Sequence, residues 1–158
     1  MTKAHVMVGG MIIGLAGAVG AANAAPRAQA VAVACRDVPE AESHLAVLLS
    51  PDDVLRVDAL AAHQHIDDPS VPPGEGALIV IAAQPFVTAV WLEQAIECHV
   101  ARNAASGHAG ASRSPLDVDG ARFGVTSASG TLIVAVTTDD PRAAREILTR
   151  ARALAPAR

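Results

Sequence analysis

Histidine side chains are the groups in this 158-residue chain best suited to chemistry. His63 and His65 are separated by one residue, so in an extended segment both rings point to the same side. His99 directly follows Cys98, and His108 follows shortly after. Imidazole nitrogens, with carboxylates or a free thiolate nearby, are ligands for divalent first-row metals. We therefore predict a transition-metal site for Cu, Zn or Ni, with His63, His65, His99 and His108 as ligands.

Each candidate ligand also has an interpretation without a metal, which for His63 and His65 is only that of a solvated pair in a loop. His99 lies on the apolar stripe of a predicted helix, where a histidine can pack in the core and bond to the backbone. His108 follows Gly107 and can cap the last carbonyls of that helix. Asp139 and Asp140 precede a proline, which is typical of helix caps. The alternative is therefore a chain whose histidines bind no metal.

Other reactive arrangements fit poorly. Covalent haem attachment needs a cysteine at the position of Ala95, before Cys98 and His99. Neighbouring residues on a helix point about 100° apart, so Cys98 and His99 do not form a nucleophile–base pair. No glycine-rich phosphate loop follows the apolar run 77–83, and the segment 117–120 has too few oxygen ligands for a calcium loop. The sequence favours a binding or interaction protein over an enzyme.

The composition argues against nucleic acid as a partner. The formal net charge is −4 and aromatic residues make up 2%, so both phosphate-binding charge and base-stacking side chains are scarce. Hydrophobic residues make up 51% and charged residues 18%, which is the opposite of the pattern of disordered chains. We expect a folded domain that does not bind nucleic acid.

The first 24 residues have the pattern of a secretory signal. Lys3 is followed by an apolar, glycine-rich run and then by small residues up to Ala24, before Ala25-Pro26. The prediction is a signal peptide over 1–24, an exported protein in the periplasm or outside the cell, and no membrane span after cleavage. A retained membrane anchor, and lipidation at Cys35, are the alternatives.

The chain has two cysteines, Cys35 and Cys98. An even number of cysteines in an exported domain favours a disulfide, and this bridge would close a long loop. The alternative keeps Cys98 as a thiolate metal ligand beside His99, which requires the bridge to be open.

The elements that must position these groups follow from apolar periodicity. Apolar residues that alternate with polar ones, as at 55–61, or that form a continuous run predict strands, and an apolar spacing of three and four residues predicts helices. Proline after an acidic residue marks the start of the last helix. The expected elements are strands at 55–61, 77–83, 121–128 and 131–137, with the last two joined as a hairpin through Ser129-Gly130, and helices at 87–105 and from 141 to about 154. The alanine-rich segment 26–49 has no clear period and predicts only a short helix at about 39–47, and Ser50-Pro51 predicts one helical turn before the first strand.

This order predicts an α+β domain over 55–155, preceded by an N-terminal extension over 25–54. The strand at 77–83 and the elements after it match a ferredoxin-like split βαβ arrangement that lacks its last strand. We expect the 55–61 strand to fill that edge, which gives a four-stranded antiparallel sheet with two helices on one face. This topology gathers one group of polar residues at one end: His63, His65, Asp67, Asp68, His99, His108, Asp139 and Asp140.

The segment from Gly76 to His108 resembles an uncharacterised family of exported proteobacterial proteins. The likeness lies in a strand followed by a helix with the pattern W-L-x5-C-H-x-A-R-N-x3-G-H, which begins at Trp91. It extends to the D-D-P-x-x-A-R-E-I segment that begins at Asp139. The resemblance implies export and marks Trp91 and Arg102 as motif residues. We expect Arg102 to pair with Asp67 or Asp68.

Two hypotheses follow. The first is a small exported binding protein with a transition-metal site at one end of the domain. The second is a structural or protein-interaction module of the cell envelope, stabilised by the Cys35–Cys98 bridge and without a metal. A metal ion or an envelope protein is accordingly the expected partner.

Overall fold

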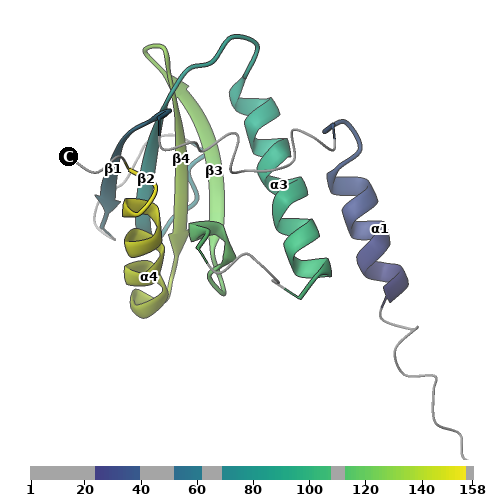
Figure 1. Ribbon diagram of the computed structural model, residues 1–158. Helices are drawn as coiled ribbons and strands as arrows, with labels where there is room; N and C mark the ends of the chain where they lie inside the picture. Colours follow the sequence, from purple (N-terminus) through teal and green to yellow (C-terminus); the bar gives the residue numbers. More distant parts are fainter. Residues whose placement is uncertain (1–23, 40–51, 62–68, 108–112, 156–158) are drawn as a thin grey trace, which may run out of the picture.

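The computed structural model describes residues 24–39, 52–61, 69–107 and 113–155. Figure 1 shows a sheet with helices beside it. The elements in chain order are α1 (Ala24–Ala34), β1 (Val54–Leu60), β2 (Glu75–Ala82), α3 (Ala89–Ala105), the 3-10 helix η2 (Pro115–Asp117), β3 (Arg122–Ala128), β4 (Thr131–Thr138) and α4 (Pro141–Arg152).

The four strands form one antiparallel sheet in the order β1-β2-β4-β3. β2 and β4 pair along their whole length, from Glu75 opposite Thr138 to Ala82 opposite Thr131. β1 pairs with the outer side of β2, with a register shift between Val54 and Arg56. The predicted α+β class and four-stranded antiparallel sheet are confirmed, and the edge strand does come from the N-terminal side.

A two-residue turn joins β3 to β4. Ser129 and Gly130 have φ angles of 50° and 78°, the left-handed values that a tight hairpin turn requires. The Thr131 hydroxyl donates to the carbonyl oxygen of Ala128 at 2.7 Å. The hairpin expected at Ser129-Gly130 is therefore present, and its turn sets the register of the two strands.

One apolar cluster holds the helices to the sheet. Alternate residues of β2, which include Ile79, are fully buried against side chains of α3 and α4. Leu92 and Ile96 of α3 and Ile147 of α4 are the largest helical side chains in this cluster. α4 lies across β2 and β4, whereas α3 packs beside β3 (Figure 1).

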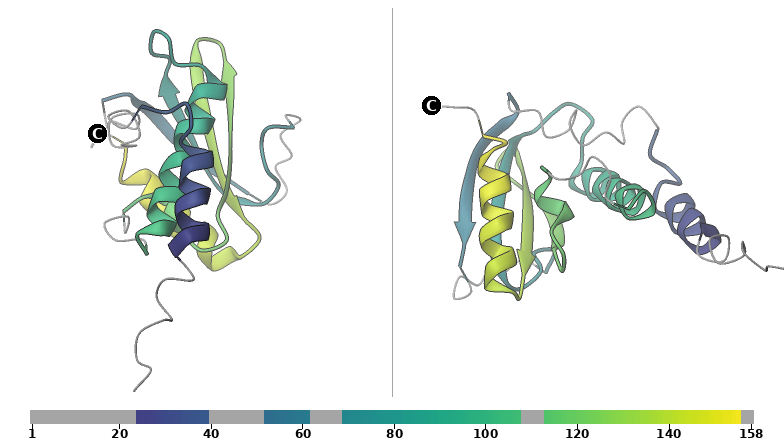
Figure 2. Two further views of the ribbon diagram at one scale, coloured as in Figure 1. Left: turned by 90° about the vertical axis from the view of Figure 1, so that its right-hand side faces the viewer. Right: turned by 60° about the horizontal axis from the view of Figure 1, so that its bottom comes forward.

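α1 was not expected. The predicted short helix at about 39–47 falls almost entirely outside the described residues, and the alanine-rich stretch before it showed no clear period. In the structure, α1 packs against α3, on the side away from the sheet (Figure 2). Because alanine has a high intrinsic helix propensity, the helix needs no amphipathic pattern, and tertiary contacts fix its position.

The expected strand and helix boundaries agree with the structure to within about two residues. The helical turn expected to begin at Ser50-Pro51 falls partly outside the described residues. Within them, Asp52 and Asp53 form a turn before β1. No helix in the described part of the chain is long and apolar enough to cross a membrane.

Residues 69–74, between β1 and β2, cross the sheet face opposite the helices. Val125 of β3 is buried in the core, and successive residues of a strand face opposite sides of the sheet, so a side chain at Gly124 would face the 69–74 segment. A Cβ atom at Gly124 would lie 1.6 Å from the carbonyl oxygen of Ser70. Glycine is therefore required where this segment passes over β3.

Candidate functional site

Three of the four predicted metal ligands, His63, His65 and His108, lie outside the described residues. Asp67 and Asp68, the expected partners of Arg102, lie outside them too. Among the residues that the structure describes, no group of three or more His, Cys, Asp or Glu side chains is placed to hold a metal ion. The metal site therefore stays a prediction from the sequence.

His99 is the one predicted ligand whose surroundings are described. It is half-buried on α3, and its Nε2 atom lies 2.7 Å from the Nδ2 atom of Asn103, one turn later. The same Nδ2 atom donates to Oδ1 of Asp117 at 3.0 Å. An amide nitrogen that donates to Asp117 also donates to His99, so Nε2 accepts and the ring proton of a neutral His99 lies on Nδ1.

This chain of hydrogen bonds connects two elements. Asn103 lies near the end of α3, and Asp117 is the last residue of η2. The Ser114 hydroxyl caps η2 by accepting a hydrogen bond from the backbone of Leu116 at 3.2 Å. His99 and Asp117 thus fasten the segment after α3 to the helix itself, which is a structural role.

Cys98 is joined to Cys35 by a disulfide. Cys98 is fully buried in α3, and Cys35 directly follows α1. The predicted bridge is therefore present, and Cys98 does not act as a thiolate ligand while the bridge is closed. A sulfur atom in a disulfide carries no lipid, so the lipidated form of Cys35 is incompatible with this structure.

Asp139 and Asp140 have different roles. The Asp140 carboxylate accepts a hydrogen bond from the backbone of Arg142 at 2.8 Å and caps α4, as expected. Asp139, which was also assigned to the cap, instead accepts two hydrogen bonds from Arg122 at 2.8 and 2.7 Å. These bonds lower the pKa of Asp139 and raise that of Arg122.

A cleft of about 300 Å³ lies between η2 and α4, near these residues. Four carboxylates and two guanidinium groups line it: Asp117, Asp119, Asp140, Glu146, Arg142 and Arg150. Arg150 donates to the carbonyl oxygen of Ser114 at 3.0 Å and pairs with Glu146. This arginine therefore links α4 to the segment that carries η2.

Trp91 and Arg102, the two motif residues of α3, lie outside the cleft. Trp91 is half-buried and packs against the apolar cluster, and its backbone N–H donates to the Thr88 hydroxyl that caps α3. Arg102 is half-buried in the last turn of α3. Neither side chain lines the cleft between η2 and α4.

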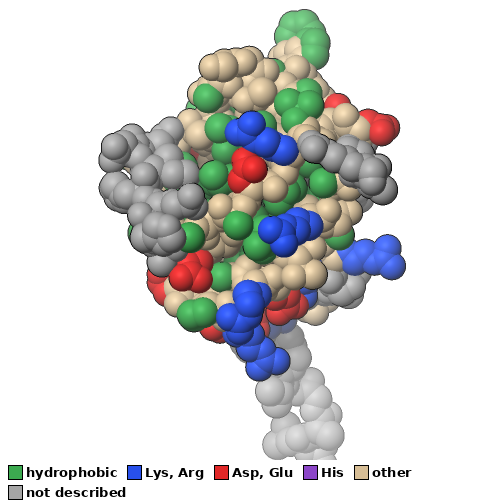
Figure 3. Space-filling view, turned by 90° about the vertical axis from the view of Figure 1, so that its left-hand side faces the viewer, with side chains coloured by type: hydrophobic (Ala, Val, Ile, Leu, Met, Phe, Trp, Pro, Cys, Tyr) green, Lys and Arg blue, Asp and Glu red, His purple; other side chains and the backbone are tan. Residues whose placement is uncertain are grey.

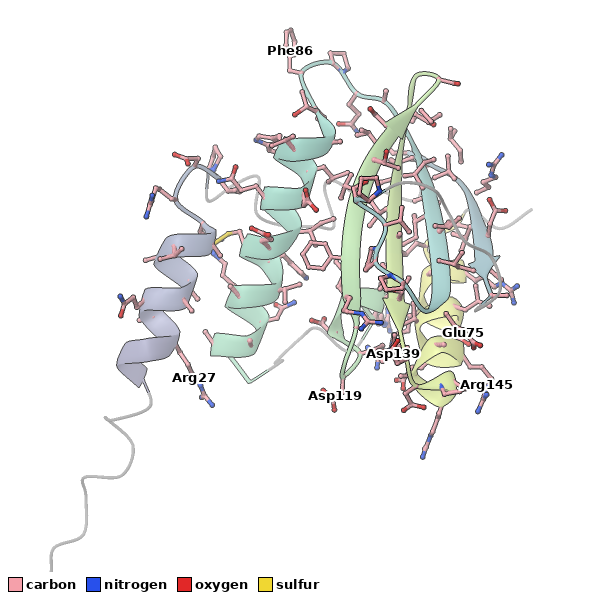
Figure 4. The ribbon with its side chains drawn as sticks, turned by 180° about the vertical axis from the view of Figure 1, so that it is seen from behind. Arg27, Glu75, Phe86, Asp119, Asp139 and Arg145 are labelled. Carbon is pink, nitrogen blue, oxygen red and sulfur yellow. A yellow bond between two sulfur atoms is a disulfide. The ribbon has the colours of Figure 1, made fainter. Side chains whose placement is uncertain are left out.

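The feature that the sequence reasoning missed is an apolar tip, formed by Phe86 and Val90. The Phe86 side chain is 100% exposed and Val90 is 75% exposed. Figure 4 shows Phe86 pointing away from the molecule, at the end opposite Glu75, Asp119, Asp139 and Arg145. In Figure 3 a hydrophobic side chain projects at the top, whereas several charged side chains lie toward the bottom.

Phe86 also has an unfavourable backbone conformation. The Val87 N–H donates to the carbonyl oxygen of Gln84 at 3.2 Å, with Pro85 and Phe86 as the central residues of the turn. Phe86 has a φ of 70°, and the third position of such a proline turn normally takes glycine or asparagine. A left-handed conformation costs an L-residue about 1–2 kcal/mol. The sequence signal was thus a phenylalanine where a turn favours glycine.

Comparisons with protein-family models, with curated proteins and with solved structures found no match.

Proposed function

We propose that this chain is an exported protein-interaction module of the cell envelope, which binds a protein partner through the apolar tip formed by Phe86 and Val90. The observation that carries the proposal is the complete exposure of Phe86. An aromatic side chain stabilises a fold mainly by being buried, and the exposed Phe86 side chain makes no such contribution. Aromatic side chains in this situation are typical anchors of protein interfaces.

Export is part of the same proposal. The signal-like segment over 1–24 supports it, and so does the disulfide, because such bridges persist in oxidising compartments. On the sequence resemblance alone, we also assign the chain to the exported proteobacterial family with the tryptophan-leucine helix motif. We expect the protein in the periplasm or the medium, with an N-terminus at Ala25.

For the domain over 55–155 we propose a ferredoxin-like variant of the split βαβ fold. The order β1-β2-β4-β3 supports this assignment, because β4 lies between the two strands that α3 connects. β1 occupies the edge position of the strand that follows the second helix in that fold. Residues 25–54 are then an extension that the disulfide ties to the domain.

Photo-crosslinking tests the interaction function. Benzoylphenylalanine is placed at Val90 in the full chain, in cells that naturally make the protein, and its adducts are compared with those from the same residue at Arg145. Arg145 is exposed on α4 at the opposite end and serves as the matched control (Figure 4). We expect one protein adduct from position 90 that position 145 does not give. Equal adducts from both positions, or none from position 90, contradict the proposal.

A further inference from the structure

The loop that carries Phe86 is held firmly at both ends. Before the turn, the Gln84 side-chain amide donates to the Asp53 carboxylate at 2.8 Å, and the Ala82 N–H donates to the carbonyl oxygen of Asp53 at 2.9 Å. After the turn, Thr88 caps α3. The turn that presents Phe86 is therefore bounded by hydrogen bonds on both sides, and a backbone ordered in this way lowers the entropy cost of binding.

The surroundings of the tip are acidic. Val90, Glu93 and Glu97 follow one another at helical spacings of three and four residues, so they share one stripe of α3. Asp52 and Asp53 precede β1 beside the loop. No Lys or Arg occurs in residues 82–101. A partner that covers the tip and extends along this stripe of α3 therefore meets carboxylates on one side of an apolar centre.

We propose that Phe86 inserts into an apolar pocket of a protein partner and that the rim of this pocket carries Lys or Arg side chains opposite Glu93 and Glu97. The proposal rests on the interaction function and names the chemistry of its partner. Interfaces commonly combine a buried aromatic centre with complementary charges at the rim.

A protein pocket fits this tip better than a lipid surface does. Peripheral binding to membranes depends on a broad apolar face and on basic residues that attract anionic lipids. The tip offers one aromatic side chain and one valine, and the charges beside it are carboxylates. A single rigid aromatic group gains most where a pocket surrounds it on all sides.

The test measures affinity for the protein that position 90 captures, with the purified full-length mature chain. Phe86→Asn removes the anchor and places in the turn a residue that tolerates its φ. Glu97→Gln removes one rim charge at an exposed position. Val33→Ser is the matched control, because Val33 is 59% exposed on α1 and lies outside the tip.

We expect Phe86→Asn to weaken binding by at least about tenfold. Glu97→Gln should weaken it about two- to fivefold at low salt, with a smaller loss at high salt, because rim charges are screened. Val33→Ser should stay within about twofold of the wild-type chain. Circular dichroism of each variant checks that the fold is unchanged.

The outcomes separate the two proposals. An adduct whose affinity is insensitive to Phe86→Asn overturns Phe86 as the anchor and leaves only the finding that a protein binds beside Val90. Binding that Glu97→Gln strengthens overturns the basic rim. The partner assignment is also overturned if position 90 captures a second copy of this chain, or if the chain floats with phosphatidylethanolamine–phosphatidylglycerol vesicles in a Phe86-dependent way. Absence of any adduct overturns both proposals.

Discussion

Arg122 and Asp139 form an ion pair with two hydrogen bonds, which joins β3 to the residue that precedes the α4 cap. The same guanidinium donates to the carbonyl oxygen of Pro73 at 2.7 Å. The Thr137 hydroxyl donates to that oxygen as well, at 3.3 Å. Arg122 therefore connects the start of β3 and the residue after β4 to the segment 69–74, which crosses the sheet over Gly124.

This ion pair predicts a pH dependence of stability. The hydrogen bonds from Arg122 lower the pKa of Asp139 below its ordinary value of 3.8. A carboxylate with a depressed pKa in the folded state stabilises the protein at pH values above 3.8, and the contribution is lost as the pH falls through the lower, folded-state pKa. We expect Asp139→Asn to lower the free energy of unfolding at about pH 6 and to have a smaller effect at about pH 2.5.

Urea unfolding at the two pH values measures this difference. Asp119→Asn is the control, because Asp119 is an exposed carboxylate at the same end of the molecule (Figure 4). Both side chains of the Arg122–Asp139 pair are well exposed, so salt should reduce the effect. An Asp139→Asn effect that is equal at both pH values would contradict the assignment.

The close approach at Gly124 predicts a destabilising substitution. In Gly124→Ala, the new methyl group would overlap the Ser70 carbonyl oxygen and lie 3.0 Å from Cδ of Pro72. The 69–74 segment must then move off the sheet, and we expect a loss of about 1–3 kcal/mol in unfolding free energy. Ser127→Ala, at an exposed position of the same strand, should change it by less than about 0.5 kcal/mol. Equal stability of the two variants would show that the 69–74 segment moves away from residue 124 with no loss of unfolding free energy.

The sheet and its two helices were predictable because their signals are local. The apolar run around Ile79 marked the central strand, and Asp140-Pro141 marked the start of α4. Asp139 and Asp140 look alike in the sequence, however. Only the position of Arg122, on another strand, decides that Asp139 forms the ion pair and Asp140 forms the cap.

α1 and the apolar tip were not predictable in the same way. The position of α1 depends on its packing against α3 and on the bond between Cys35 and Cys98, both of which are contacts between distant parts of the chain. In the sequence, the Gln84-Pro85-Phe86 segment shows only that no glycine-rich phosphate loop follows the apolar run 77–83. Its exposure depends on the fold, although a proline turn with phenylalanine in place of glycine was a visible signal.

The disulfide predicts a large stability difference. A cross-link between residues 63 positions apart lowers the entropy of the unfolded chain by an amount worth about 4 kcal/mol. We expect Cys35→Ala/Cys98→Ala, and the reduced wild-type chain, to lose a similar free energy of unfolding. Thiol titration of the denatured, unreduced chain should find no free thiol. A loss below about 1 kcal/mol would contradict this prediction and would mean that the cross-link to Cys35 restricts the unfolded chain little.

Metal analysis tests the remaining ligand hypothesis. Cys98 is in the disulfide, and Nε2 of His99 accepts a hydrogen bond from Asn103, so both are engaged in structural contacts. Less than about 0.1 equivalent of Cu, Zn or Ni in the untagged mature chain after dialysis would contradict the metal hypothesis, since a stable site needs three or four such ligands. One equivalent that disappears in His63→Ala/His65→Ala would establish the metal site instead.

The turn at Phe86 predicts a substitution that stabilises the chain. Asparagine tolerates the left-handed conformation better than phenylalanine does, and it loses no buried contact here because Phe86 is 100% exposed. We expect Phe86→Asn to raise the free energy of unfolding by up to about 1 kcal/mol in thermal or urea unfolding. Val90→Asn, on the exposed side of α3, lacks this benefit and should be neutral or slightly destabilising. A loss of stability in Phe86→Asn would show that the phenylalanine contributes to folding, and the argument for an interface anchor would then fail.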